Sequence, residues 1–210
     1  LQLKAAMDEI AKDFATIHTV KREKVKVGIV GEIFVKYSAL GNNELEQFLH
    51  EQDCEVMVPG VMHFGMYCMS NVALDRQFYG GKFWPAAGAK FLLFYFGKVE
   101  KYMLKAMKKY GHRPVADYAT TRQMAGGIVS LGSKMGEGWL LSAEMAGLVE
   151  EGFPNIICAQ PFGCLPNHIN GRGMMNKIKQ QRPEANIVAI DYDTSASKVN
   201  QENRIKLMLA

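Results

Sequence analysis

The residues best suited to chemistry lie in the tract 158–168 (CAQPFGCLPNH), which joins an apolar, strand-like run to a turn rich in Pro and Gly. Two thiols, an amide and an imidazole surround this junction. A buried strand does not need such side chains, whereas a ligand site at the carboxyl edge of a parallel sheet uses them. The tract therefore favours a bound metal centre or ligand over a purely structural domain.

The cysteines are the first candidates for this chemistry. Cys164 follows one strand-like run directly, and Cys68 follows another by about two helical turns, so both are expected over the same sheet edge. Converging thiolates could hold an iron–sulfur cluster because soft sulfur ligands suit iron, but no C-x₂-C pair is present, and Cys164 is either a ligand or a reactive thiol. Cys158 and Cys54 lie inside apolar runs, where a thiol is usually a small buried hydrophobe.

Two further residues are candidate catalytic groups. His168 is either a ligand or proton donor, or an ordinary hydrogen-bonded loop residue. Glu32, which follows a buried run, is either a site carboxylate or a partner in a helix cap. Asp191 and Asp193 resemble the acidic end of a nucleotide-binding strand, and equally the N-cap of the last helix.

Four short runs predict the elements that position these residues. They are rich in Val and Ile and apolar on both faces, as parallel strands covered by helices must be. The strands are expected at 25–34, 54–59, 155–162 and 186–192, and helices at 44–51, 138–151, 174–181 and 197–209. Asn43 and Glu46 have the spacing of a capping box for the first helix. This alternation predicts a doubly wound, mainly parallel α/β sheet of flavodoxin- or Rossmann-like type.

Residues 1–210 are expected to form a single α/β domain with a helical insertion at about 61–130. Two helices are predicted in the insertion, at 61–78 and 88–110, with breaks at Gly80-Gly81 and Trp84-Pro85. The chain begins without an initiator Met, which favours a domain excised from a longer polypeptide.

Composition excludes several classes of protein. The net charge of +4 is mild and accompanies no aromatic-and-basic motif, so a nucleic-acid partner is not expected. No apolar run approaches the roughly 18 residues of a membrane span. The four cysteines are too few for a disulfide framework in a chain of 210 residues, and a reducing, cytoplasmic setting fits best.

Four tracts together resemble a known family. They are KVGIVGEIFVKY (26–37), EVMVPGVMHFGMYCMSN (55–71), the run from GEGWLLSAEM to NHINGRGM (136–174) and EANIVAIDYDTSASKVNQENRIKLML (184–209). They are similar to the C-terminal part of the large CoA-substrate-specific enzyme activase proteins, relatives of the 2-hydroxyacyl-CoA dehydratase system. The resemblance covers most of the chain and is least clear at 83–120.

The resemblance implies a dehydratase-like module that carries a 4Fe–4S cluster and receives low-potential electrons from an ATP-hydrolysing activase. It implies that Cys68 and Cys164 are cluster ligands and Cys158 a third. Gln160, His168 and the backbone from Gly163 to Asn167 would donate hydrogen bonds to cluster sulfurs. A CoA thioester is an implied partner, and the module is not expected to be active as an isolated domain.

Two other functions remain open at this stage. One is a non-catalytic scaffold or interaction domain of a fused activase. The other is a metal-free CoA- or nucleotide-binding domain that uses strand-edge glycines and a helix N-terminus for phosphates. The sequence also leaves the oligomeric state open, a homo-oligomer included.

Overall fold

The computed structural model describes residues 2–193 and 195–210, which form two compact units. The helical unit comprises the chain up to Glu23 together with Gly65–Thr120. The sheet unit comprises Lys24–Phe64 and Thr121–Ala210. The insertion expected at about 61–130 corresponds mainly to the second segment of the helical unit, which the N-terminal residues join.

The sheet unit is built on four parallel strands in the order β2-β1-β3-β4. The strands are β1 (Val25–Gly31), β2 (Cys54–Met57), β3 (Asn155–Gln160) and β4 (Asn186–Asp191). All four begin where the sequence predicts and end earlier than predicted. Because β2 lies on one side of β1 and β3 on the other, the strand order reverses between β1 and β3, where open α/β sheets bind ligands.

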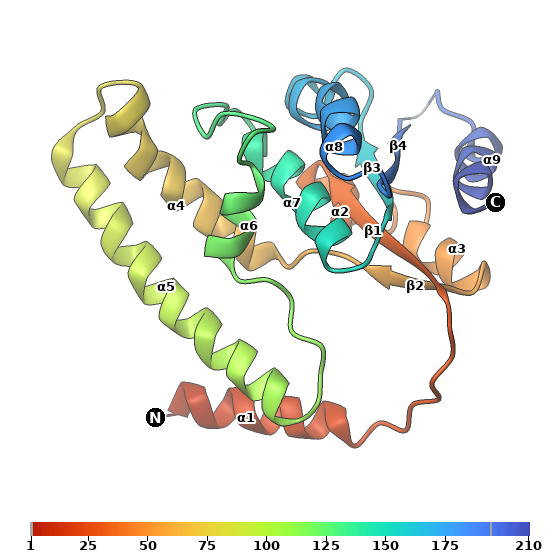
Figure 1. The fold of residues 1–210 in the computed structure, drawn as a ribbon, viewed down its shortest axis with the longest axis horizontal. Helices are drawn as coiled ribbons and strands as arrows, with labels where there is room; N and C mark the ends of the chain where they lie inside the picture. Colours follow the sequence, from red (N-terminus) through yellow and green to blue (C-terminus); the bar gives the residue numbers. More distant parts are fainter. Residues whose placement is uncertain (1, 194) are drawn as a thin grey trace. The chain divides into compact units, whose positions relative to one another are not determined.

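Helices cover both faces of the sheet (Figure 1). They are α2 (Ile33–Tyr37), α3 (Leu45–Glu51), α7 (Gly138–Glu150), α8 (Met175–Gln181) and α9 (Lys198–Leu209), and the short turns η1 (Asn167–Gly171) and η2 (Arg172–Met174) precede α8. On one face, α7 and α8 pack on Val30, Ile156 and Cys158. On the other, α2, α3 and α9 pack on Ile29 and Ile157. The doubly wound α/β fold is therefore confirmed.

The end of β1 shows why its predicted strand, 25–34, stops early. Gly31 has φ = 141°, and a Cβ there would lie 1.8 Å from the carbonyl oxygen of Ala159. Only glycine allows the two strands this approach, after which the Glu32 amide donates to the same oxygen at 2.9 Å. The chain then turns into α2, so residues 33 and 34 are helical instead of extended.

The cap of α3 also differs from the expected capping box. Asn43 and Glu44 both adopt the left-handed conformation, with φ of 54° and 60°. The preceding residue, Asn42, is buried, and its Oδ1 accepts a hydrogen bond from the Leu45 amide at 3.1 Å. Two successive left-handed residues move the capping role from Asn43 to Asn42, a conformation that the sequence spacing does not reveal.

The helical unit contains α1 (Gln2–Ala15), most of α4 (Val61–Phe78) and all of α5 (Phe83–Lys109). The helix α6 (Tyr118–Met124) continues from this unit into the sheet unit. Helix α5 begins five residues before the predicted start at Gly88, because Pro85 lies in its first turn, where a helix tolerates proline. The end of α5 meets α1 through an ion pair between Lys109 and Asp8 at 2.8 Å. Among the described residues, no helix combines the length and apolar character that crossing a membrane requires.

Candidate functional site

The candidate site lies on the carboxyl edge of the sheet unit, on the α7 and α8 face. Successive side chains of a strand point to opposite faces, so Cys158 and Gln160 share one face of β3. Asp191 pairs with Gln160 in the register of β4 and points to the same face. The loop after β3 and η1 then add Cys164, Asn167 and His168 to this edge.

Asn167 connects the two thiols. Its side chain is fully buried, and η1, where it lies, is one turn of π-helix, a feature often found at functional sites. Its Nδ2 donates to the Cys164 sulfur at 3.2 Å and to Glu137 Oε2 at 3.4 Å. Its Oδ1 lies 4.0 Å from the Cys158 sulfur and is the acceptor for that thiol. The amide therefore contacts both thiols and a carboxylate at once.

Glu137 is a site residue that the sequence reasoning missed. It is 8% exposed and lies between Gly136 and Gly138, both with positive φ, at the start of α7. Its Oε1 accepts from the Ile33 amide at 3.0 Å, so the carboxylate links α2 to Asn167. An acidic residue between two glycines before a buried helix was the signal in the sequence that could have identified it.

Two roles were predicted for Glu32, a site carboxylate and a helix cap, and the structure shows the helix cap. Its Oε2 accepts from the Val35 amide at 2.9 Å, which caps the N-terminus of α2. Asp193 likewise binds backbone, since its Oδ1 accepts from the amides of Ser195 and Ala196 at 2.7 and 2.8 Å. Hydrogen bonding in that turn lowers the Asp193 pKa.

Gln160 lies between Asp191 and His168. Its Nε2 donates to Asp191 Oδ1 at 2.8 Å and lies 3.4 Å from His168 Nδ1. The side chain is fully buried, and its Oε1 has no hydrogen-bond partner among the described residues. The predicted site residues Gln160, Asn167 and His168 are thus brought together. Gly163, in the same loop, is exposed, with φ = 75° and open space around the position of a Cβ.

The two thiols at this edge differ in accessibility. Cys164 is half-buried, and its sulfur accepts an N–H from Asn167 at 3.2 Å. Cys158 is fully buried, and burial, with the charges of Asp191 and Cys164 adding to it, raises its pKa to about 12. Packing encloses Cys158 further, since only 3.1 Å separates its sulfur from the position of a Cβ on Gly171.

The other two cysteines lie elsewhere in the chain. Cys54 begins β2, at the amino edge of the sheet, and is buried as the sequence predicts. Cys68 is exposed on α4 in the helical unit. The convergence of Cys68 with Cys164 stays a prediction.

In the sheet unit, Cys164 has the features of a candidate cluster ligand. Its sulfur is partly accessible and accepts a hydrogen bond, and such a bond tunes a bound metal. Cys158 does not fit as a ligand in this conformation, because its thiol is enclosed and its high pKa favours the protonated form. Within residues 2–193 and 195–210, no group of three or more His, Cys, Asp or Glu side chains is arranged to hold a metal ion.

Comparison of the chain with protein-family models, with curated proteins and with solved structures gives no match.

Proposed function

We propose that this chain is an iron–sulfur redox module of a 2-hydroxyacyl-CoA dehydratase-like system, with Cys164 as the cluster ligand that the sheet unit provides. One observation carries the proposal. The Cys164 thiol lies on the carboxyl edge of a parallel sheet, and the buried amide of Asn167 donates to its sulfur at 3.2 Å. Open α/β sheets bind their ligands at this edge.

The hydrogen bond from Asn167 has a specific value for a metal ligand. An N–H that points at sulfur stabilises the negative charge of a thiolate and influences the reduction potential of a bound cluster. Glu137 accepts from the same Nδ2 and so keeps the amide nitrogen, and not its oxygen, toward Cys164. The orientation of Asn167 is therefore fixed by two contacts.

A 4Fe–4S cluster would supply one-electron transfer at low potential. The residues of this chain would bind it through Cys164, donate hydrogen bonds to it and exclude water from the buried side that Gln160 and Asn167 occupy. Cys68 remains the second candidate ligand, and other ligands would come from a partner domain. The proposal includes an ATP-hydrolysing activase as electron donor, a CoA thioester as substrate and a cytoplasmic location.

The test is anaerobic reconstitution of the chain with ferrous iron and sulfide, followed by iron and sulfide analysis and EPR of the reduced protein. We expect Cys164→Ala to abolish the cluster signal and lower bound iron at least about tenfold, because loss of a ligand or its supporting contact costs this much affinity or more. Cys54→Ala is the matched control, since Cys54 is at the opposite edge of the sheet. Equal iron and an equal EPR signal in Cys164→Ala would contradict the assignment.

A thermal-shift comparison separates the proposal from a metal-free CoA- or nucleotide-binding domain. A ligand that binds only the native state raises the melting temperature by mass action. We expect neither ATP nor a CoA thioester to do so in the metal-free chain. A rise with CoA esters that Cys164→Ala leaves intact would favour the metal-free alternative.

A further inference from the structure

The side-chain oxygen of Gln160, Oε1, is buried and has no hydrogen-bond partner among the described residues. An amide nitrogen carries two hydrogens, and both acceptors within reach of Gln160 Nε2 are on neighbouring site residues. Native structures rarely leave such a buried oxygen unsatisfied. The orientation of the amide therefore needs a cause.

Asp191 provides that cause. An ionised carboxylate only accepts hydrogen bonds, and its Oδ1 lies 2.8 Å from Gln160 Nε2. If the amide were turned over, Gln160 Oε1 would face this oxygen and two acceptors would repel each other. Asp191 thus fixes which end of the amide points toward His168, and Oε1 is left without a partner among the described residues.

The orientation of the amide in turn selects the tautomer of His168. An N–H of Gln160 that points at His168 Nδ1 requires a lone pair there, so the proton of the neutral imidazole is on Nε2. The ring is partly exposed, and its Nε2 has no partner among the residues that the structure describes. A fixed donor is therefore available at the edge of the sheet.

We infer that Asp191 and Gln160 are positioning residues that hold His168 as an Nε2–H donor to an acceptor atom of the group bound at this edge. That acceptor is a lone pair on sulfide or on a carbonyl oxygen. The inference depends on the proposed function only for the identity of the acceptor. The arrangement Asp191–Gln160–His168 is a property of the metal-free chain and can be tested there.

The test is a long-range nitrogen–proton correlation spectrum of the chain labelled with nitrogen-15 in histidine, recorded metal-free at mildly alkaline pH. The chain has five histidines, and the His168 ring is assigned as the signals lost in His168→Gln. We expect one tautomer for His168, with Nδ1 unprotonated and Nε2 protonated. A substantial population protonated at Nδ1 in the unaltered chain would overturn the inference.

Two variants test the relay. Gln160→Glu replaces the donor by an acceptor, so we expect the proton to move to Nδ1. Asp191→Asn keeps the shape of the side chain, but the new amide can donate a hydrogen bond to Gln160 Oε1. The Gln160 amide is then free to turn over and present Oε1 to His168, so a population of His168 protonated at Nδ1 should appear. Asp191 makes no hydrogen bond to His168 itself, so a purely structural role would not move this proton.

The matched control is Gln180→Glu, an exposed position on α8, which should leave the His168 ring unchanged. An unchanged His168 ring in folded Asp191→Asn overturns the relay, whether or not Gln160→Glu folds. The His168 tautomer is measured in the metal-free chain, so the result does not depend on iron binding. A negative result for Cys164→Ala and a negative result for the tautomer are therefore distinguishable.

Discussion

Two thiols that lie on opposite sides of one amide have very different chemical environments. Cys158 is fully buried, and Cys164 is half-buried at the end of the loop that follows β3. Burial first, and then neighbouring negative groups, Asp191 first among them, raise the pKa of Cys158 to about 12 from an ordinary 9.0. At the residue scale, Cys158 therefore behaves as a core side chain, while Cys164 is the accessible thiol.

The raised pKa of Cys158 predicts a loss of stability at alkaline pH. Between the ordinary value of 9.0 and about 12 the unfolded chain releases this proton and the folded chain keeps it. Unfolding is then favoured as pH rises, at up to about 1.4 kcal/mol per pH unit. We expect Cys158→Ala to remove this slope over the same pH window, as measured by urea unfolding.

Cys158→Ala can also lower stability at every pH through the cavity that it creates, and such a constant offset does not test the prediction. The difference in slope does. Parallel pH dependences of the two proteins above pH 9 would show that Cys158 ionises as easily in the folded state as in the unfolded state.

At the element scale, the short helix α2 depends on contacts with α7. Five residues are too few for a helix that is stable alone in water. Glu137 accepts from the Ile33 amide at the first turn, and the Lys36 ammonium binds the buried carboxylate of Glu144 on α7 at 3.1 Å. Burial, the largest single effect, lowers the Lys36 pKa, but the charges and hydrogen bonds of Glu144 and Tyr37 together raise it above its ordinary value.

The buried pair predicts a large penalty when one partner is removed. We expect Lys36→Met to lower the free energy of unfolding by about 3–5 kcal/mol, because it leaves Glu144 charged and buried without its partner. The double variant Lys36→Met/Glu144→Leu should recover most of this loss, since an apolar pair replaces the charges. Urea unfolding of the four proteins of this double-mutant cycle measures both effects.

The pair Lys198–Glu202 on α9, with an exposed lysine and a partly exposed glutamate, is the matched control, with an N–O distance of 3.9 Å. Lys198→Met should cost no more than about 0.5 kcal/mol, as is typical for exposed pairs. If Lys36→Met costs as little as Lys198→Met, the buried pair does not join α2 to α7 as we describe.

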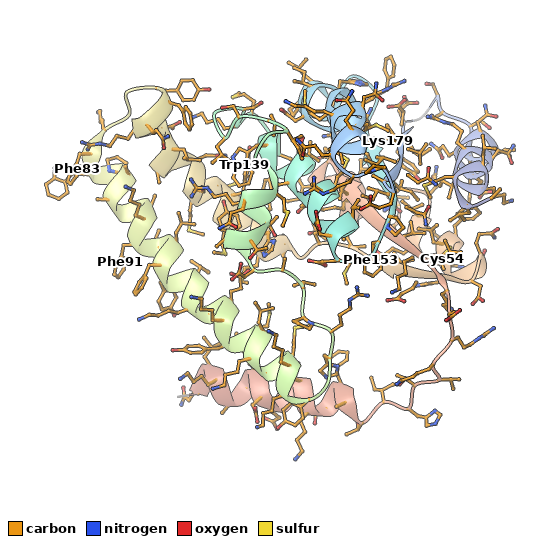
Figure 2. The ribbon with its side chains drawn as sticks, in the orientation of Figure 1. Cys54, Phe83, Phe91, Trp139, Phe153 and Lys179 are labelled. Atoms are coloured by element: carbon orange, nitrogen blue, oxygen red, sulfur yellow. The ribbon has the colours of Figure 1, made fainter. Side chains whose placement is uncertain are left out.

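At the scale of the whole molecule, the two units have cores of different composition. The sheet unit buries large side chains such as Trp139 and Phe153. The buried residues of the helical unit include several alanines, and helix α5 exposes Trp84 by 80% and Phe91 by 69% of their surface (Figure 2 labels Phe91). We therefore expect the helical unit to bury less apolar area per residue than the sheet unit.

This difference predicts two classes of hydrogen exchange. Amides of α5 should exchange through opening of the helical unit, and amides of β1 and β3 only through the costlier opening of the sheet unit. Native-state hydrogen exchange followed by mass spectrometry of peptides measures both. Equal protection of α5 and β3 would indicate that the chain unfolds as one cooperative body.

The sequence predicted those parts of the fold that depend on local patterns of apolar and polar residues. Each strand was identified because runs apolar on both faces fit only a sheet covered on both sides. The end of β1 was misplaced because it depends on Ala159, a residue distant in sequence. The start of α5 was misplaced because Pro85 was interpreted as a break, whereas the first turn of a helix tolerates a proline. Asn42 caps α3 in place of Asn43 because Asn43 and Glu44 adopt the left-handed conformation, which the residue spacing does not predict.

The candidate site divides in the same way. Gln160, Asn167 and His168 could be named from the sequence because they lie at the end of a buried strand or soon after it, where polar side chains indicate a site. Glu137 was missed because its role depends on the approach of α7 to α2 across 104 residues of chain, and its position between two glycines was the only signal in the sequence. The burial of Cys158 was expected from its place inside an apolar run, but the close approach of Gly171 to its sulfur became visible only in the structure.

The amino-acid sequence by itself determined the parallel α/β sheet and the edge at which its polar residues gather, because side-chain periodicity and strand polarity are local properties. Only the tertiary structure decided which thiol is accessible and which neighbours orient the Asn167 and Gln160 amides. Burial and hydrogen-bond direction depend on atoms from several elements at once, and these meet only when the chain is folded.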